Sequence, residues 1–242
     1  MKKTLLLSTA LLLSIAAVPA YAQAYQPTNN APQENAAPEV DPVEKYIAYI
    51  QTEWARIKYQ IPDEEAQLDA IHRLEDYAGR VSASFPTRAE PKIWEGITLS
   101  TDAGIVKGMS ALGKVKKAKA LFEAALHINP MALDGSAYTS LGSLYYQVPG
   151  WPIAFGDDDA AEENLKAALK INPNGIDPNF FYGDFLLQDN RLDDAEHYLT
   201  KALAAPARES RPMADAGRKQ EIRARLAEIK EKQKAHARPK YN

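Results

Sequence analysis

Residues 161–173 read AEENLKAALKINP, and this stretch decides the fold. Ala161, Leu165 and Ala168 follow one another at steps of four and three, which places them on one face of a helix. Pro173 ends the stretch, and proline cannot continue a helix, so the chain must turn there. The two alanines leave room for a second helix to approach, and the leucine between them fills the remaining gap. The stretch therefore predicts a helix that packs closely against a neighbour.

The same small–large–small–proline pattern occurs three times in the chain. The other copies are Ala118-Phe122-Ala125-Pro130 and Ala195-Leu199-Ala202-Pro206, the last proline coming one place early. The third copy begins 34 residues after the second. Gly142 and Gly183 supply a further small position in the helix before the second and the third copy. A regular period of this length is typical of stacked helical hairpins.

These residues resemble the tetratricopeptide repeat (TPR), over residues 93–206. The match is weaker in the first repeat, where Val106 stands at the usual small position. The resemblance implies an all-α fold: a right-handed α-solenoid of three to four TPR-like hairpins with a C-terminal capping helix. Residues 41–86 resemble a degenerate hairpin, and residues 212–235 resemble a solvating end helix with a thin apolar stripe. The expected TPR-like domain spans residues 41–210, followed by a basic capping helix and tail at 211–242.

The chain also shows a distant similarity to the periplasmic helical component of tripartite (TRAP) transporters. Those relatives are typically lipoproteins, whereas this chain contains no cysteine. The absence of cysteine also excludes disulfides, thiolate nucleophiles and cysteine-ligated metals.

The first 22 residues predict a secretory signal peptide. A basic start precedes an apolar run at residues 5–18, and Ala20-Tyr21-Ala22 fits signal peptidase, with cleavage after Ala22. An uncleaved anchor is the alternative, but the run is short for a membrane span of about 20 residues. We therefore expect a periplasmic protein without a stable membrane anchor. Residues 23–40 are rich in Pro, Asn, Gln and Ala and predict a disordered tether.

Charge is unevenly distributed along the chain. The formal net charge is −3, which disfavours general nucleic-acid binding. Residues 211–242 nevertheless hold ten Lys/Arg against four Asp/Glu. These cations either solvate the last helix or contact anionic lipid headgroups or the acidic part of a neighbouring copy.

The second repeat carries extra residues between its helices, and we call residues 148–159 the insertion loop. It contains Trp151 and Phe155, which are unusual in a solvated loop. Either these aromatic side chains anchor a partner, or the loop folds back and both join the core. Asp157 to Asp159 predict a helix cap, and they fail the calcium-loop pattern. Asp177 likewise predicts a cap, ahead of Pro178.

No catalytic constellation, metal site or cofactor motif is visible, so we do not expect an enzyme. The register of the repeats predicts an inner binding surface formed by Thr139, Ser143, Tyr146, Phe180, Asp184 and Leu187. The leading hypothesis is a periplasmic scaffold or adaptor that binds a protein or peptide through this surface and the insertion loop. The alternatives are a ligand-binding accessory component of a transporter and, third, an enzyme with a cleft-assembled site. The sequence leaves the oligomeric state open.

Overall fold

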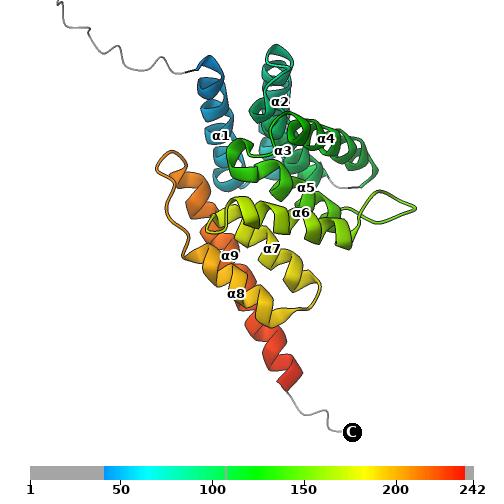
Figure 1. Ribbon diagram of the computed structural model, residues 1–242, viewed down its shortest axis with the longest axis vertical. Coiled ribbons are helices and arrows are strands. Elements are labelled where there is room, and N and C mark those ends of the chain that lie inside the picture. The colour runs from blue at the N-terminus through cyan, green and yellow to red at the C-terminus, as the bar shows by residue number, and fades with distance from the viewer. Residues whose placement is uncertain (1–40, 107, 238–242) are drawn as a thin grey trace, which may run out of the picture. The chain divides into compact units, whose positions relative to one another are not determined.

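Helices make up the regular structure of the part of the chain that the computed structural model describes, residues 41–106 and 108–237 (Figure 1). The predicted signal peptide and tether lie outside these residues. The elements are α1 (Pro42–Gln60), α2 (Glu64–Ser84), α3 (Ala89–Val106), α4 (Met109–Ile128), a short 3-10 helix (Ala132–Gly135), α5 (Ser136–Gln147), α6 (Asp158–Ile171), α7 (Ile176–Gln188), α8 (Leu192–Leu203) and α9 (Pro212–Ala237).

Aspartates begin three of these helices. The side chain of Asp41 accepts a hydrogen bond from the Val43 backbone N–H at 3.0 Å, with Pro42 in the first helical position. Asp63 caps α2, and Asp157 accepts from the backbone N–H of Ala160 at 3.0 Å to cap α6. The predicted capping role of Asp157 is confirmed.

The repeats form three antiparallel hairpins, α3/α4, α5/α6 and α7/α8. Glycine lies where the two helices of each hairpin cross. A Cβ added to Gly142 would lie 2.7 Å from Cγ of Leu165, and one added to Gly183 would lie 2.7 Å from Cγ of Leu199. These contacts pair each glycine with the large residue of its repeat, and the all-α solenoid is confirmed.

In the first hairpin, the predicted small position is wrong. Gly96, not Val106, takes this place, because a Cβ at Gly96 would lie 2.5 Å from the ring of Phe122. Val106 is the last residue of α3. Both helices of this hairpin are longer than those of the next two, which shifts the crossing point towards the start of α3.

Gly142→Ala is expected to lower the free energy of unfolding by about 1–3 kcal/mol, because the added methyl group overpacks the α5/α6 crossing. The matched control is Gly113→Ala, in the interior of α4 with open space around it. That change should raise the stability by about 0.5–1 kcal/mol through helix propensity. Urea unfolding measures the free energy of unfolding of both variants. If both substitutions lower it, or both raise it, the close crossing of α5 and α6 at Gly142 is contradicted.

The C-terminal helix α9 packs its thin apolar stripe on the last hairpin, as predicted for a capping end helix, but it also contacts α1, which was not predicted. Ile222 and Ile229 are fully buried in the core that α9 shares with α7 and α8. Gly217 approaches the ring of Tyr59 on α1 so closely that a Cβ there would collide with it. Helix α9 thus contacts α7, α8 and α1, whereas a repeat in an open solenoid contacts only its neighbours.

Glu162 on α6 ties the second and third hairpins together. It accepts hydrogen bonds from the Tyr182 hydroxyl and from Arg191, both at 2.9 Å, and pairs with Lys166 at 3.0 Å. Burial opposes the ionisation of Glu162, but these three partners outweigh it and lower its pKa to about 2.

The Glu162→Gln variant is therefore expected to be less stable than the native protein at neutral pH. A depressed folded-state pKa contributes stability above the ordinary value of 4.5, and this contribution is lost as the pH falls towards 2. Urea unfolding of both proteins at pH 7, 4 and 2.5 should show the stability gap narrowing step by step. A gap that does not depend on pH would contradict this role.

Candidate functional site

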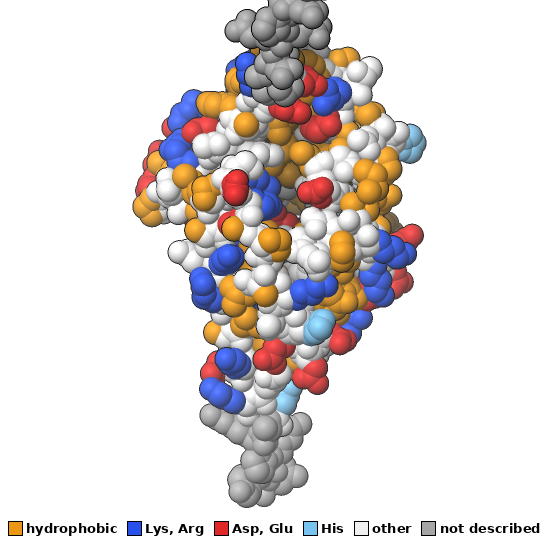
Figure 2. Space-filling model, turned by 60° about the vertical axis from the view of Figure 1, so that its left-hand side comes forward, with side chains coloured by type: hydrophobic (Ala, Val, Ile, Leu, Met, Phe, Trp, Pro, Cys, Tyr) orange, Lys and Arg blue, Asp and Glu red, His pale blue; other side chains and the backbone are white. Residues whose placement is uncertain are grey.

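The inner helices surround a cavity of about 1020 Å³, which opens on the face shown in Figure 2. Hydrophobic, acidic and basic side chains gather around this hollow. Its walls come from α1, from the first helix of each hairpin (α3, α5 and α7), from α4 and from α9. The volume is at the upper end of the range typical of ligand pockets.

One wall of the cavity is apolar. Ile97 of α3, Leu112 and Val115 of α4 and Leu144 of α5 line it. At the rim, Met109 is 81% exposed and Ile153 of the insertion loop is 61% exposed. The cavity lining therefore includes apolar side chains that are in contact with solvent.

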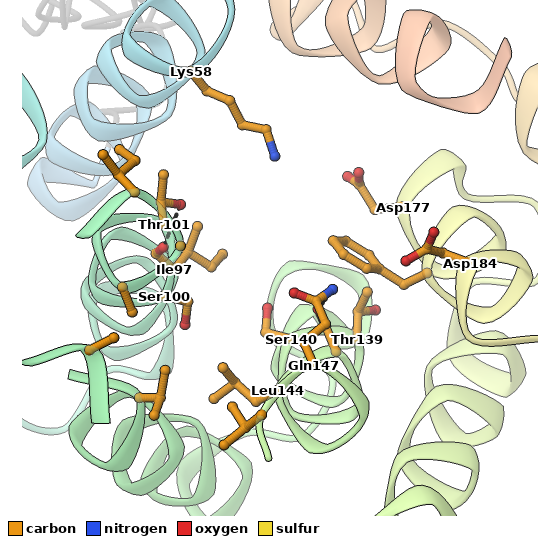
Figure 3. A pocket seen from close by; sticks show the side chains of 18 of the residues that line it. Lys58, Ile97, Ser100, Thr101, Thr139, Ser140, Leu144, Gln147, Asp177 and Asp184 are labelled. Carbon is orange, nitrogen blue, oxygen red and sulfur yellow. Dashed lines mark hydrogen bonds between the residues drawn. The ribbon is translucent and has the colours of Figure 1, made fainter. Parts of the chain in front are cut away.

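Helix α5 turns a polar stripe towards the cavity. The side chains follow one another at helical spacing: Ser136, Thr139, Ser140, Ser143 and Gln147. Figure 3 shows Thr139, Ser140 and Gln147 together on this helix, with Leu144 beside them. Hydroxyl groups both donate and accept hydrogen bonds, so this stripe accommodates varied polar groups.

The end of the cavity between α1, α7 and α9 is charged. Asp177 on α7 pairs with Arg208 at 2.6 Å and with Arg218 at 3.0 Å. Burial would raise the pKa of Asp177, but the charges of Arg218 and Arg208 outweigh it and hold the pKa well below its usual range. The prediction of Asp177 as a helix cap is wrong, because α7 begins at Ile176 with Gly175 as its N-cap.

Arg218 is the centre of this charged end. Its guanidinium carbon lies 4.3 Å from the ring centroid of Phe180 and 4.7 Å from that of Phe181. It also bonds Glu221 at 2.6 Å, and two turns further along α9 Arg225 pairs with Asp184 at 2.6 Å. These arginines of the basic C-terminal segment bind acidic groups of their own chain, which neither prediction for the segment had foreseen.

Two further cations face the cavity with fewer partners. Lys58 extends from α1 into the open space (Figure 3), with its Nζ 3.2 Å from Oε1 of Glu221. Arg211 lies over the face of Trp94, 5.1 Å from the ring centroid, and its buried Nε has no hydrogen-bond partner among the described residues. Burial lowers the pKa of both Lys58 and Arg211.

Comparisons with known proteins agree with this architecture. Residues 153–216 match the family model described as tetratricopeptide repeat. Residues 153–216 therefore contain tetratricopeptide repeats. Its fold is similar to the crystal structure of a thermophilic TPR protein from Thermus thermophilus, at 17% identity and a TM-score of 0.52. That match covers 77% of this chain and 91% of the other. No curated protein sequence matches the chain.

A TPR solenoid generally serves as a scaffold for protein interactions, and this is the broad role that the family supports. No helix within residues 41–106 and 108–237 combines the length and apolarity needed to cross a membrane. Among the same residues, no three His, Asp or Glu side chains converge as a metal site.

Four of the six residues predicted for the inner TPR surface line the cavity: Thr139, Ser143, Phe180 and Asp184. Tyr146 lies behind them and donates a hydrogen bond from its hydroxyl to Oδ2 of Asp184 at 2.8 Å. Leu187 does not face the cavity, because it is 2% exposed and packs in the core shared by α7, α8 and α9. Whether these residues bind a partner stays a prediction.

The two aromatic side chains of the insertion loop differ: Phe155 packs against the fold, whereas Trp151 is exposed. Phe155 is half-buried and packs edge-on against Tyr145, with ring centroids 5.8 Å apart. Trp151 is 89% exposed. The loop is nevertheless held by backbone hydrogen bonds from Gly156 to Pro149 at 2.9 Å and from Asp157 to the carbonyl of Tyr145 at 3.0 Å.

The sequence analysis missed the cations of this TPR cavity, Lys58, Arg211 and Arg218. One signal for Lys58 was available, because it follows Trp54 by four residues and so falls beside the apolar stripe of α1. No comparable signal marks Arg211 or Arg218, since their partners are distant in sequence.

Proposed function

We propose that this TPR protein is an adaptor that acts in the periplasm and binds a partner protein at its inner face, with Trp151 as the anchor. The observation that carries the proposal is the exposure of Trp151 on a loop that is hydrogen-bonded on both sides. Large aromatic side chains are the commonest anchors of protein interfaces. Exposing one costs free energy in the isolated protein, and a partner that covers it recovers this cost.

The position of the anchor adds support. Ile153 belongs to the same loop and, with Met109, forms the exposed apolar rim of the cavity. A partner segment that covers Trp151 can therefore continue over this rim towards the hydroxyl groups of α5. Apolar contacts at the centre with polar groups around them are the usual composition of such an interface.

The adaptor proposal is tested by chemical cross-linking in intact cells, followed by mass spectrometry of the captured neighbours. Native protein should capture one dominant neighbour, and Trp151→Ala should lose most of it. Met131→Ala is the matched control, because Met131 is also exposed but lies outside the cavity lining and the loop. Capture that persists unchanged in a folded Trp151→Ala protein would refute the anchoring role.

The periplasmic setting rests on the N-terminal sequence alone. The expected result is that protein recovered from the periplasmic fraction begins at Gln23, as measured by intact mass. Protein that retains residues 1–22 and remains in the cytoplasm would contradict export.

The open cavity favours a second candidate, a ligand-binding accessory component of a transporter. Its volume of about 1020 Å³ and its mixed apolar and charged lining suit a small molecule. A ligand raises the midpoint of thermal unfolding without any partner protein, whereas a pure adaptor requires the partner.

A further inference from the structure

We infer that the cavity binds a long-chain carboxylate, with the chain along the apolar wall and the carboxylate at Arg211. This inference rests on the second candidate above, in which the cavity holds a small molecule. It does not depend on the adaptor proposal.

Arg211 differs from the other arginines at the charged end of the cavity in its lack of an ion pair in the part of the chain that the structure describes. Arg218 bonds two carboxylates, and Arg225 bonds Asp184 and Glu228. Arg211 differs, since none of the ion pairs formed among the described residues involves it and its buried Nε donates to nothing there. Arg211 is half-buried, and an anion beside a half-buried cation that has no bonded counter-charge among those residues stabilises the site.

The position of Arg211 over Trp94 leaves its N–H groups available to a ligand. The indole of Trp94 covers one face of its guanidinium. Cation–π stacking leaves the N–H groups at the edge of the guanidinium plane free to donate, and this fork matches a carboxylate. Lys58 also lines the cavity and, like Arg211, lies within the influence of the charges of Asp177 and Arg218, so it adds a second positive charge there.

The charged end and the apolar wall lie apart in the cavity. Figure 3 shows Lys58 and Leu144 on opposite sides of the open space, and Ile97 on α3 lies at a height between them. A molecule that contacts both regions needs an apolar body and a charged head. Met109 and Ile153 belong to the lining and are exposed to solvent, so they offer apolar contacts to a chain that enters the cavity.

The test is isothermal titration calorimetry of the purified protein with dodecanoate, kept below its micelle concentration. Dodecyltrimethylammonium carries the same chain with a positive head, and butanoate carries the same head with a short chain. We expect saturable binding of one dodecanoate per chain and much weaker binding, by at least about tenfold, of the other two. Absence of dodecanoate binding, or equal binding of dodecyltrimethylammonium, would overturn the inference.

Substitutions test the carboxylate-binding end and the apolar wall of the site separately. Arg211→Gln is expected to weaken dodecanoate binding at least tenfold, while Arg73→Gln, on the exposed surface of α2, leaves it unchanged. Leu112→Ser should also weaken binding, because Leu112 lines the wall without belonging to a buried core cluster. Circular dichroism checks that each variant is folded, and native affinity in folded Arg211→Gln would overturn the role of Arg211.

The adaptor proposal and the carboxylate inference are tested by independent experiments. Trp151 does not line the cavity, so Trp151→Ala is expected to bind dodecanoate with native affinity. Loss of the cross-linked neighbour in that variant therefore concerns the adaptor alone. A failure of dodecanoate to bind leaves the capture experiment unaffected.

Discussion

Arg218→Ala is expected to lower the free energy of unfolding by about 3–5 kcal/mol, because it removes a buried ion-pair partner from two half-buried carboxylates and leaves Asp177 with Arg208 and Glu221 with Lys58. The side chain of Arg218 is 6% exposed and bonds Asp177 on α7 and Glu221 on α9. Its removal also uncovers the rings of Phe180 and Phe181. Urea unfolding at pH 7, followed by circular dichroism, measures the change.

The control for this variant is Arg223→Ala, on the same helix but exposed. Surface changes of this kind usually alter stability by less than about 0.5 kcal/mol. Similar small losses in both variants would show that the charged face of α9 is solvated, and would contradict its packing against α7 and α1.

Phe122→Ala is the second large effect, with an expected loss of about 3–5 kcal/mol. Phe122 is fully buried, fills the crossing above Gly96 and borders the cavity. Deleting its ring leaves a void that the rigid α3/α4 crossing cannot close. The measurement is the midpoint of unfolding in guanidinium chloride, which reports the change in stability when the m-value is the same in both proteins.

Ile128→Ala serves as the comparison for Phe122→Ala, since Ile128 is the last residue of α4 and is partly exposed. The loss at Ile128 is expected to be several times smaller. A loss at Phe122 no greater than that at Ile128 would contradict the assignment of Phe122 as the large residue of the first repeat.

The hairpins were predictable from sequence because their packing signals are local. A small residue, a large residue and a proline at fixed steps define each crossing, and Leu165 and Leu199 take the expected places. The prediction failed at Gly96 because the longer helices of the first hairpin break the spacing. Local patterns do not reveal how far a crossing shifts when both helices grow.

The contact of α9 with α1 was not predictable, for a different reason. The apolar stripe of α9 is thin, and its many charged residues are typical of a solvated helix. Two of them, Arg218 and Arg225, are instead paired with Asp177 and Asp184 of α7. Pairing between residues distant in sequence leaves no periodic signal, so both this packing and the role of Asp177 were missed.

The inner surface was partly predictable. Thr139, Ser143, Phe180 and Asp184 follow from the register of α5 and α7. The prediction for Leu187 was wrong because the last turn of α7 packs against α8 and α9, so the side chain of Leu187 lies in the core and not in the cavity. The cations were missed because Lys58 and Arg211 come from segments on either side of the repeats.

The central claim is that α9 packs back onto α1 and thereby closes one side of the cavity. The chain has no cysteine, so Thr52→Cys on α1 and Gln220→Cys on α9 place two spin labels without interference. Both positions are exposed. Pulsed electron paramagnetic resonance should give one narrow distance distribution between the labels. A broad distribution, as expected for an end helix that is free of α1, would contradict the closure.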